Sequence, residues 1–332
     1  FADGSKAVEA AERRAIRDQL HPNRSRFGLY SVSNGEQRKS SYTAYLPNRF
    51  HGFSKKERAR VLITKDFVSE MRESNPTFLT RFGGKASPSY VLPKIVSKLE
   101  YHGEDLARRE ALDAAKLAKE EKAPRIFIPS ASPGVIPIFF QRGRVYRDHL
   151  EYLAALTKEM RKEYRAILGV DGVDLQIDAP DLAMAKVAAV GWGIDFYKAL
   201  PHHVDAINEA IAGLPSSRIR VHYCFGNWLG SHKFDADFAR IVPELLRLKA
   251  GTIVGEMANP RHEGDVLKLA DYLREHAWPK RLTLAAGVID VKTPIVETPE
   301  TVAGRLERLA GIDKIGPERL MVGTDCGFET FA

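Results

Sequence analysis

The sequence has very little cysteine: Cys224 and Cys326 are the only two among its 332 residues. So few thiols cannot build a disulfide framework, and they fit a protein of the reducing cytoplasm. Long apolar runs are also absent, and no segment approaches the roughly 20 residues needed to cross a bilayer. The chain starts at Phe1 without a recognisable signal peptide, so we expect its true N-terminus to lie outside this sequence. We therefore expect a cytoplasmic protein with no membrane association.

Nucleotide-binding glycine motifs are absent as well. No G-x-G-x-x-G and no G-x-x-x-x-G-K-[ST] follows any strand-like segment, so nothing supports a dinucleotide or P-loop fold. The net charge is +7, but the basic residues are spread along the chain rather than gathered on one helix or among aromatic residues. We therefore expect no nucleic-acid partner.

What the sequence does contain is a regular alternation of helix-like and strand-like segments. Amphipathic spacing predicts helices at residues 5–20, 104–122, 146–168, 201–212, 236–249, 263–276 and 299–310. Apolar runs and period-two alternation predict strands at residues 29–36, 125–132, 173–180, 218–227, 251–258, 281–290 and 319–328. Such alternation is typical of a parallel sheet. Polar residues at the end of each strand favour an α/β fold of the (β/α)8 TIM barrel type over an open doubly wound sheet.

Local signals refine this organisation. Pro201 is expected to open the helix at 201–212, and Thr298 is expected to cap the helix that begins at Pro299. We expect a single domain over residues 1–332. A helix before the first visible strand, and no helix after the last, suggest that parts of the first and last barrel units are missing from this sequence.

Residues 42–102 do not follow the alternation. They contain a Gly-Gly turn at 83–84 and a strand-like run that Pro93 interrupts. We interpret this segment as an excursion that packs near the mouth of the barrel.

Chemically versatile residues gather where the predicted strands end. In a barrel these ends face one mouth, where catalytic groups collect. The strand-end residues are Glu36, Ser130, Asp178, His222, Cys224, Glu256, Asp290 and Cys326. Both cysteines of the chain belong to this set, which chance placement of core residues does not readily explain.

Four of these residues have the chemistry of a metal site. His222 and Cys224 are two residues apart, so on a strand both side chains leave the same face. They can share a zinc ion, although a core histidine beside a buried cysteine fits the spacing too. Glu256 ends an otherwise buried strand, where a carboxylate is costly unless it is paired or metal-bound. With Cys326, the set offers one nitrogen, two sulfurs and one oxygen, which suits zinc better than magnesium or calcium.

The charge of this set predicts a reaction type. Two thiolates and a carboxylate around Zn²⁺ leave one net negative charge, so the centre would activate water poorly. It could instead take up an incoming thiol as a thiolate and leave the sulfur nucleophilic. The predicted chemistry is therefore alkyl transfer to sulfur.

At these residues the sequence resembles the cobalamin-independent methionine synthase family, in particular its zinc-carrying C-terminal barrel. The matching segments are LQIDAP (175–180), VHYCFGNWLGSH (221–232), EMANPR (256–261), GVIDVKTP (287–294) and TDCGF (324–328), and NGEQRKS (34–40) resembles an early stretch of single-barrel relatives. The resemblance implies a (β/α)8 barrel with its zinc ligands at His222, Cys224, Glu256 and Cys326. It also implies that Asp178 contacts the acceptor.

The chain departs from the family pattern in several ways. The family enzyme has two barrels, whereas this chain has room for one. Lys292 stands in place of the family's catalytic histidine, and the chain does not reproduce the acidic residue expected shortly after Asp178. Lys292 could still donate a proton to a leaving nitrogen or alkoxide if burial lowers its pKa. The pattern H-x-C-x-G-N, with N-P-R-H and G-V-I-D, is similar to the single-barrel branch that includes epoxyalkane:coenzyme M transferase.

Further residues are candidates for substrate contact or proton transfer. Arg38, Lys39, Arg261 and Lys292 lie in segments expected near the mouth, where a cationic rim would suit an anionic thiol or a polyglutamate tail. Solvated surface charges are the alternative interpretation. The candidate substrate contacts are Glu36, Arg38, Asn227, Trp228, Arg261 and Asp290. His232 and His262 fit either a supporting role or plain loop positions.

Two hypotheses follow from the sequence. The first is a zinc-dependent thiol S-alkyltransferase, of the methionine biosynthesis type or of the type in which a sulfonate thiol opens an epoxide. Its partners would be a small-molecule thiol acceptor and an alkyl donor, and a homo-oligomer is compatible with it. The second is a non-catalytic barrel that binds zinc or a thiol. An open metal position would favour the first hypothesis, and a closed set of four ligands the second.

Overall fold

Seven parallel strands form the central sheet of the protein. The computed structural model describes residues 6–20, 30–60, 91–184, 186, 191–227 and 231–328. The strands are β1 (Val32–Ser33), β4 (Ile126–Ala131), β5 (Val173–Asp178), β6 (Ile219–Tyr223), β7 (Thr252–Gly255), β8 (Thr283–Ile289) and β9 (Leu320–Thr324). They lie side by side in the order of the chain, β1-β4-β5-β6-β7-β8-β9. An open doubly wound sheet reverses its strand order at a switch point, so this order favours the barrel.

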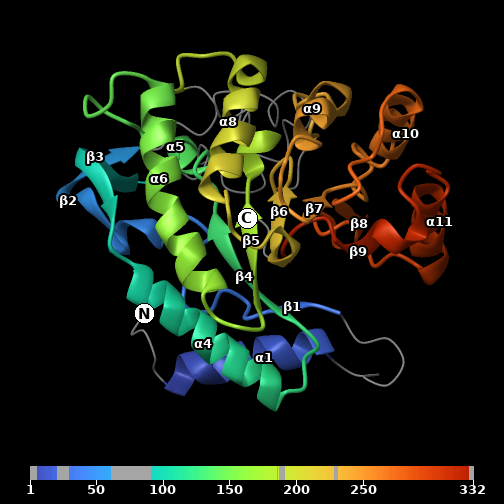
Figure 1. Ribbon diagram of the computed structural model, residues 1–332, viewed down its shortest axis with the longest axis horizontal. Helices are drawn as coiled ribbons and strands as arrows, with labels where there is room; N and C mark the ends of the chain where they lie inside the picture. Colours follow the sequence, from blue (N-terminus) through green and yellow to red (C-terminus); the bar gives the residue numbers. More distant parts are fainter. Residues whose placement is uncertain are drawn as a thin grey trace.

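Helices cover the outside of the sheet. They are α1 (Lys6–Leu20), α4 (Glu104–Glu120), the short α5 (Ile136–Phe139), α6 (His149–Leu168), α8 (Phe196–Ala210), α9 (Phe238–Leu245), α10 (Asp265–Glu275) and α11 (Pro299–Ala310). From α6 to α11 they follow one another around the strands, while α1 and α4 lie together at the bottom of the view (Figure 1). One hydrophobic core joins these elements and extends from Ile16 to Ile315.

Helix α6 shows how the sequence pattern becomes packing. Leu153, Leu156, Met160 and Tyr164 follow the three-four spacing of one helix face, and all four are buried against the core. Leu150 is 37% exposed, because it lies at the edge of this face rather than at its centre.

Two helix starts were predicted, and one of them is wrong. Thr298 caps α11 as expected, accepting a hydrogen bond from the backbone N–H of Thr301 at 3.3 Å. Pro201 does not open a helix; it lies inside α8, which begins at Phe196. The Asp195 side chain caps that helix by accepting hydrogen bonds from the backbone N–H groups of Tyr197 and Lys198. This cap sets the start of the helix, although proline prefers the first turn.

The excursion contains an antiparallel hairpin outside the main sheet. Strand β2 (Phe50–Arg60) pairs with β3 (Val91–Tyr101), and Pro93 lies within β3 opposite Arg58. The hairpin packs on α6 through residues that include Ile95 and Leu99, both buried. The Gly-Gly turn predicted at 83–84 lies outside the described residues. The assignment of residues 1–332 to one domain remains a prediction.

The described residues include no helix that is both long enough and apolar enough to cross a membrane.

A series of buried polar contacts joins the segment after β4 to α8. The Ser132 hydroxyl donates to the Asp181 carboxylate, whose second oxygen lies 2.8 Å from Nδ1 of His203. The Nε2 atom of His203 lies 2.9 Å from Nε2 of His149 on α6. A Cβ atom at Gly134 would overlap both Asp181 and His203, so this packing requires glycine at that position.

Substitution of Gly134 by alanine is therefore expected to destabilise the fold by about 1–3 kcal/mol through overpacking. The matched control is Gly304→Ala in α11, where a Cβ atom would meet no atom within 4 Å. Alanine should stabilise that helix by up to about 1 kcal/mol. Urea unfolding followed by circular dichroism measures both effects. An unchanged midpoint for Gly134→Ala would contradict this account of the packing.

Candidate metal centre

The carboxyl ends of two strands, β6 and β9, bring His222, Cys224 and Cys326 together. His222 lies on β6, Cys224 follows the end of that strand, and Cys326 follows β9. The ligand atoms of these three side chains all lie within 4.8 Å of one another. Residues two apart on a strand share a face, so His222 and Cys224 point to the same side, as the sequence predicted. The Cys326 backbone carbonyl accepts a hydrogen bond from Thr324 Oγ1 at 2.7 Å, which shapes the turn after β9.

His222 has the properties of a metal ligand. The residue is buried, and neither ring nitrogen has a hydrogen-bond partner among the residues that the structure describes. Burial lowers the pKa of His222, but interactions with Cys326, Asp178 and Glu256 outweigh it and raise the pKa to about 9. An imidazole with buried, unpaired nitrogens beside two sulfurs fits a soft divalent cation such as zinc.

The two cysteines behave as a coupled pair. Interaction with the Cys224 thiol lowers the pKa of Cys326 well below its usual range. Interaction with Cys326 in turn raises the pKa of Cys224, and burial adds to that rise. The interaction therefore favours a thiolate at Cys326 and a protonated thiol at Cys224. A divalent cation would displace this proton, because metals bind cysteine as thiolate.

Glu256 lies next to this group but is engaged elsewhere. It directly follows β7, is fully buried, and does not belong to the group of donor atoms within 4.8 Å. Its Oε2 atom accepts a hydrogen bond from the Phe225 backbone N–H at 3.1 Å. The Lys292 ammonium binds its Oε1 atom. The structure thus brings three of the four predicted ligands into one group and pairs the fourth with Lys292.

The charge of Lys292 depends on two opposing effects. From the sequence, proton donation by Lys292 was expected only if burial lowers its pKa, and burial does act in that direction. The carboxylate of Glu256 outweighs it, so the pKa of Lys292 is raised. Lys292 is therefore a buried ammonium that neutralises Glu256.

Asp325 ties the end of β9 to the segment after β7. Its Oδ1 atom accepts hydrogen bonds from the backbone N–H groups of Met257 at 2.9 Å and Ala258 at 2.8 Å. Its Oδ2 atom accepts a third from Asn259 at 2.7 Å. Burial, followed by the charge of Glu256, raises the pKa of Asp325 to about 7, although the backbone donors oppose that rise. These bonds keep Cys326 close to the Glu256 segment.

Asp178 and Glu36 bring two further carboxyl groups toward the centre. Asp178 ends β5 and pairs in register with His222 on β6. Burial raises the pKa of Asp178, and the charge of Cys326 adds to this rise. Burial likewise raises the pKa of Glu36 to about 7, with Asp178 and Cys326 contributing and Lys39 opposing. The charge of Cys326 thus affects the pKa of both carboxyl groups.

Most of the predicted cationic rim is used inside the protein. Arg38 forms ion pairs of 2.8 Å with both Glu12 on α1 and Asp113 on α4, and its side chain is only 3% exposed. Lys39 donates to the carbonyl of Pro129 and lies 3.8 Å from Glu110.

The ion pair of Arg38 with Glu12 was not predicted from the sequence. Glu12 lies on the buried face of α1 with Val8, Ile16 and Leu20, at regular four-residue spacing. That spacing was the available signal, because a carboxylate on an apolar helix face needs a buried cation.

The other predicted substrate contacts have mixed positions. The Asn227 side chain donates to the Gly327 carbonyl at 2.8 Å, beside Cys326. Asp290 is buried and accepts a hydrogen bond from the Lys292 backbone at 2.9 Å. Arg261 is exposed, and its Nε atom donates to the His232 carbonyl at 3.1 Å. Trp228 lies outside the described residues.

Comparison with known proteins gives related sequences and a related fold. Over 145 residues the chain is 33% identical to a 2-hydroxypropyl-CoM lyase of Xanthobacter autotrophicus, covering 37% of this chain and 38% of that protein. Over 246 residues it is 26% identical to a methionine synthase of Saccharolobus solfataricus, covering 72% of this chain and 61% of that protein. The chain therefore spans less than two thirds of the length of either relative.

A solved structure and a family model complete the comparison. A B12-independent methionine synthase from Shewanella sp. W3-18-1, solved in complex with selenomethionine, superimposes with a TM-score of 0.65 and 18% identity. The match covers 98% of this chain and 83% of that one; at this identity it shows the fold alone, and it confirms the predicted barrel class. The family model of the cobalamin-independent synthase catalytic domain matches residues 152–332, more than half of the chain. The protein is therefore a member of the cobalamin-independent synthase catalytic domain family.

Proposed function

We propose that the protein is a zinc-dependent thiol S-alkyltransferase. The observation that carries this proposal is the meeting of His222, Cys224 and Cys326, in which both histidine nitrogens are buried without a partner among the described residues. Such nitrogens are costly to bury unless something binds them. The family supports the same kind of reaction, since its relatives include a methionine synthase and a 2-hydroxypropyl-CoM lyase.

His222, Cys224 and Cys326 would hold zinc, with Glu256 as the adjacent fourth candidate ligand. When bound, zinc would supply the Lewis acidity that lets an acceptor thiol ionise near neutral pH. The Lys292 ammonium holds the Glu256 carboxylate, which supports a set of three protein ligands with a fourth position for the acceptor. A centre with three protein ligands is typical of catalytic zinc sites. This favours catalysis over the non-catalytic zinc or thiol-binding barrel.

The groups around the centre support an acceptor that carries a positive charge. The carboxyl groups of Asp178 and Glu36 both interact with the Cys326 sulfur, and we assign them to positioning the acceptor. An ammonium group would pair with such carboxylates. Arg38 and Lys39 are already paired with internal acids, so neither is available for a sulfonate. This supports an amino-acid thiol such as homocysteine, with a methyl group as the transferred carbon.

The alternative substrate pair is a sulfonate thiol and an epoxide. The observation that favours it is the 33% identity to the 2-hydroxypropyl-CoM lyase, together with Lys292 in place of the family histidine. Arg261 is the one exposed cation among the four candidates for a cationic rim, and it could contact a sulfonate at the mouth. In either case the partners would be small molecules. We further propose a cytoplasmic location, no nucleic-acid or membrane partner, and assembly as a homo-oligomer.

Replacing a proposed ligand should remove zinc. Cys326→Ser and His222→Gln are each expected to lower the zinc content steeply, because a ligand is lost from a set of three. The matched control is His276→Gln, an exposed histidine at the end of α10, which should retain full zinc content. Elemental analysis after dialysis measures the result. Full zinc content in Cys326→Ser would contradict the ligand assignment.

Breaking the Lys292–Glu256 ion pair should be costly in the metal-free protein. Lys292→Met leaves the Glu256 carboxylate buried without its cation, which is expected to cost about 3–5 kcal/mol. Adding Glu256→Gln should recover much of this loss, because the unpaired charge disappears. Lys280→Met, at an exposed lysine, is the control and should change stability by less than about 0.5 kcal/mol. Urea unfolding with a chelator present tests the pair, and equal stability of Lys292→Met and wild type would refute its importance.

A panel of thiols separates the candidate acceptors. Homocysteine, coenzyme M and glutathione are titrated against the zinc protein, and X-ray absorption reports whether an additional sulfur joins the metal. We expect homocysteine to add a sulfur at the lowest concentration. Addition by coenzyme M alone would select the epoxide-opening alternative. No added sulfur with any thiol would support the non-catalytic barrel.

A further inference from the structure

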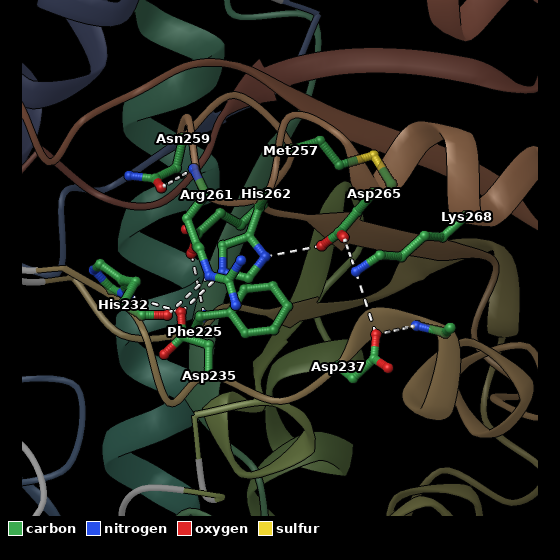
Figure 2. A network of polar contacts seen from close by, with 12 residues as sticks. Phe225, His232, Asp235, Asp237, Met257, Asn259, Arg261, His262, Asp265 and Lys268 are labelled. Atoms are coloured by element: carbon green, nitrogen blue, oxygen red, sulfur yellow. Dashed lines mark hydrogen bonds and ion pairs between the residues drawn. The ribbon is translucent and has the colours of Figure 1, made fainter.

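A second cluster of histidines and carboxylates surrounds Phe225, the residue that directly follows the proposed ligand Cys224 (Figure 2). His232 and Asp235 belong to the segment between β6 and α9, while His262 and Asp265 lie between the end of β7 and the first turn of α10. All four side chains are buried. From the sequence, His232 and His262 fit either a supporting role or plain loop positions, and the proposed reaction does not use them.

His262 lies between two carboxylates. Its Nδ1 atom is 2.8 Å from Asp265 Oδ2, and its Nε2 atom is 2.8 Å from Asp235 Oδ2. A neutral imidazole carries a single N–H and could donate only one of these hydrogen bonds, whereas an imidazolium donates both. Both distances are typical of charge-assisted hydrogen bonds. The geometry therefore fits a protonated ring.

The surrounding charges balance such a ring. Lys268 Nζ, on α10, lies 3.0 Å from Asp265 Oδ1, so Asp265 has a cation on each oxygen. Asp235 Oδ2 also lies 2.8 Å from His232 Nδ1. The negative charge of Glu256, which directly follows β7, adds to the rise in the pKa of His262. With His262 protonated, the buried acids Asp235 and Asp265 are matched by His262 and Lys268.

The same atoms could be considered for a metal ion, since donor atoms of His232, Asp235 and His262 lie within 4.8 Å of one another. An ion there would need unprotonated nitrogens at His232 Nδ1 and His262 Nε2, because metals bind the neutral imidazole. Both histidines would then lose their hydrogen bonds to Asp235. The spacing of 2.8 Å on both sides of Asp235 Oδ2 favours protons over a metal ion.

The His262 ring is stacked on Phe225. The two ring centroids are 3.5 Å apart and the planes differ by 6°. A cation over an aromatic face is attracted to it, and this attraction strengthens when water is excluded. Phe225 directly follows Cys224, and its backbone N–H donates to Glu256 Oε2 at 3.1 Å. The stack therefore connects the charged cluster to the segment that carries Cys224.

We propose that His262 is a positioning residue: a buried imidazolium, held by Asp235 and Asp265, that clamps the Phe225 ring and so keeps Cys224 and Glu256 in place beside each other. The protonation of His262 and its stack do not depend on zinc. The effect on a bound metal rests on the proposed function. His262 touches neither acceptor nor donor in this role.

The protonation state is tested by NMR on ¹⁵N-histidine-labelled protein in its zinc-loaded form. Both ring nitrogens of one histidine should carry a proton at neutral pH, and this signal should vanish in His262→Asn. A single protonated nitrogen at His262 would overturn the proposal. So would binding of a second equivalent of added zinc that Asp235→Asn abolishes, because the cluster would then be a metal site.

The positioning effect is tested by zinc affinity, measured by competition with a chelator. Phe225→Leu removes the stack but keeps the charged cluster, so its NMR signal should persist while zinc binds about 10–100-fold more weakly. The matched control is His276→Asn, which removes a similar stack of His276 on Tyr272, with centroids 4.0 Å apart, on the exposed end of α10. The control should bind zinc as the wild type does.

Wild-type affinity in Phe225→Leu would overturn the positioning role. A wild-type protein that binds no zinc would instead refute the proposed function, while the NMR experiment would still decide the charge of His262. Because His262→Asn leaves two acids short of a cation and can fail to fold, Phe225→Leu is the variant that decides the role.

Discussion

Three backbone hydrogen bonds to one carboxylate hold the candidate centre together. Asp325 accepts N–H groups from Met257, Ala258 and Asn259, and this joins the end of the last described strand to the segment after β7. Together with the pairing of β9 with β8, this connection fixes Cys326 relative to Glu256 and the β6 ligands. The neighbouring Gly287 leaves room for the carboxylate, because a Cβ atom there would overlap it. The centre thus depends on a side chain that would not itself bind the metal.

Buried charged side chains near the candidate centre form ion pairs with side chains of opposite charge. Glu256 is paired with Lys292, Arg38 with Glu12, and Lys39 with Glu110, so few charges near the centre are left for a ligand. Leaving any one of them unpaired inside the protein would be expensive. Arg38 and Lys39, which seemed suited to an anionic substrate, are engaged in internal ion pairs. The carboxyl groups of Asp178 and Glu36, in contrast, act electrostatically on the sulfur of Cys326. The charge balance of the fold therefore bears directly on which thiol the proposed transferase would accept.

Family membership and chemistry rest on different parts of the molecule. The family model matches residues 152–332, a span that includes His222, Cys224 and Cys326, and this membership supports thiol alkylation as a class. Lys292 forms an ion pair with Glu256 next to these residues, and this pair fixes the position of its ammonium group. The stack of His262 on Phe225 would hold the Cys224 segment in place without contacting the substrate.

The sequence by itself determined the barrel class, the order of its strands and helices, and the candidate ligands, because these depend on short-range periodicity and on residues one or two positions apart. His222 and Cys224 share a face for this reason, and Thr298 caps its helix for the same one. Only the tertiary structure decided the partners: that Glu256 meets Lys292 rather than the sulfurs, that Arg38 turns inward to Glu12, and that His262 lies between Asp235 and Asp265. These pairs join residues on different strands and helices, and local patterns contain no information on the distances that packing creates between them.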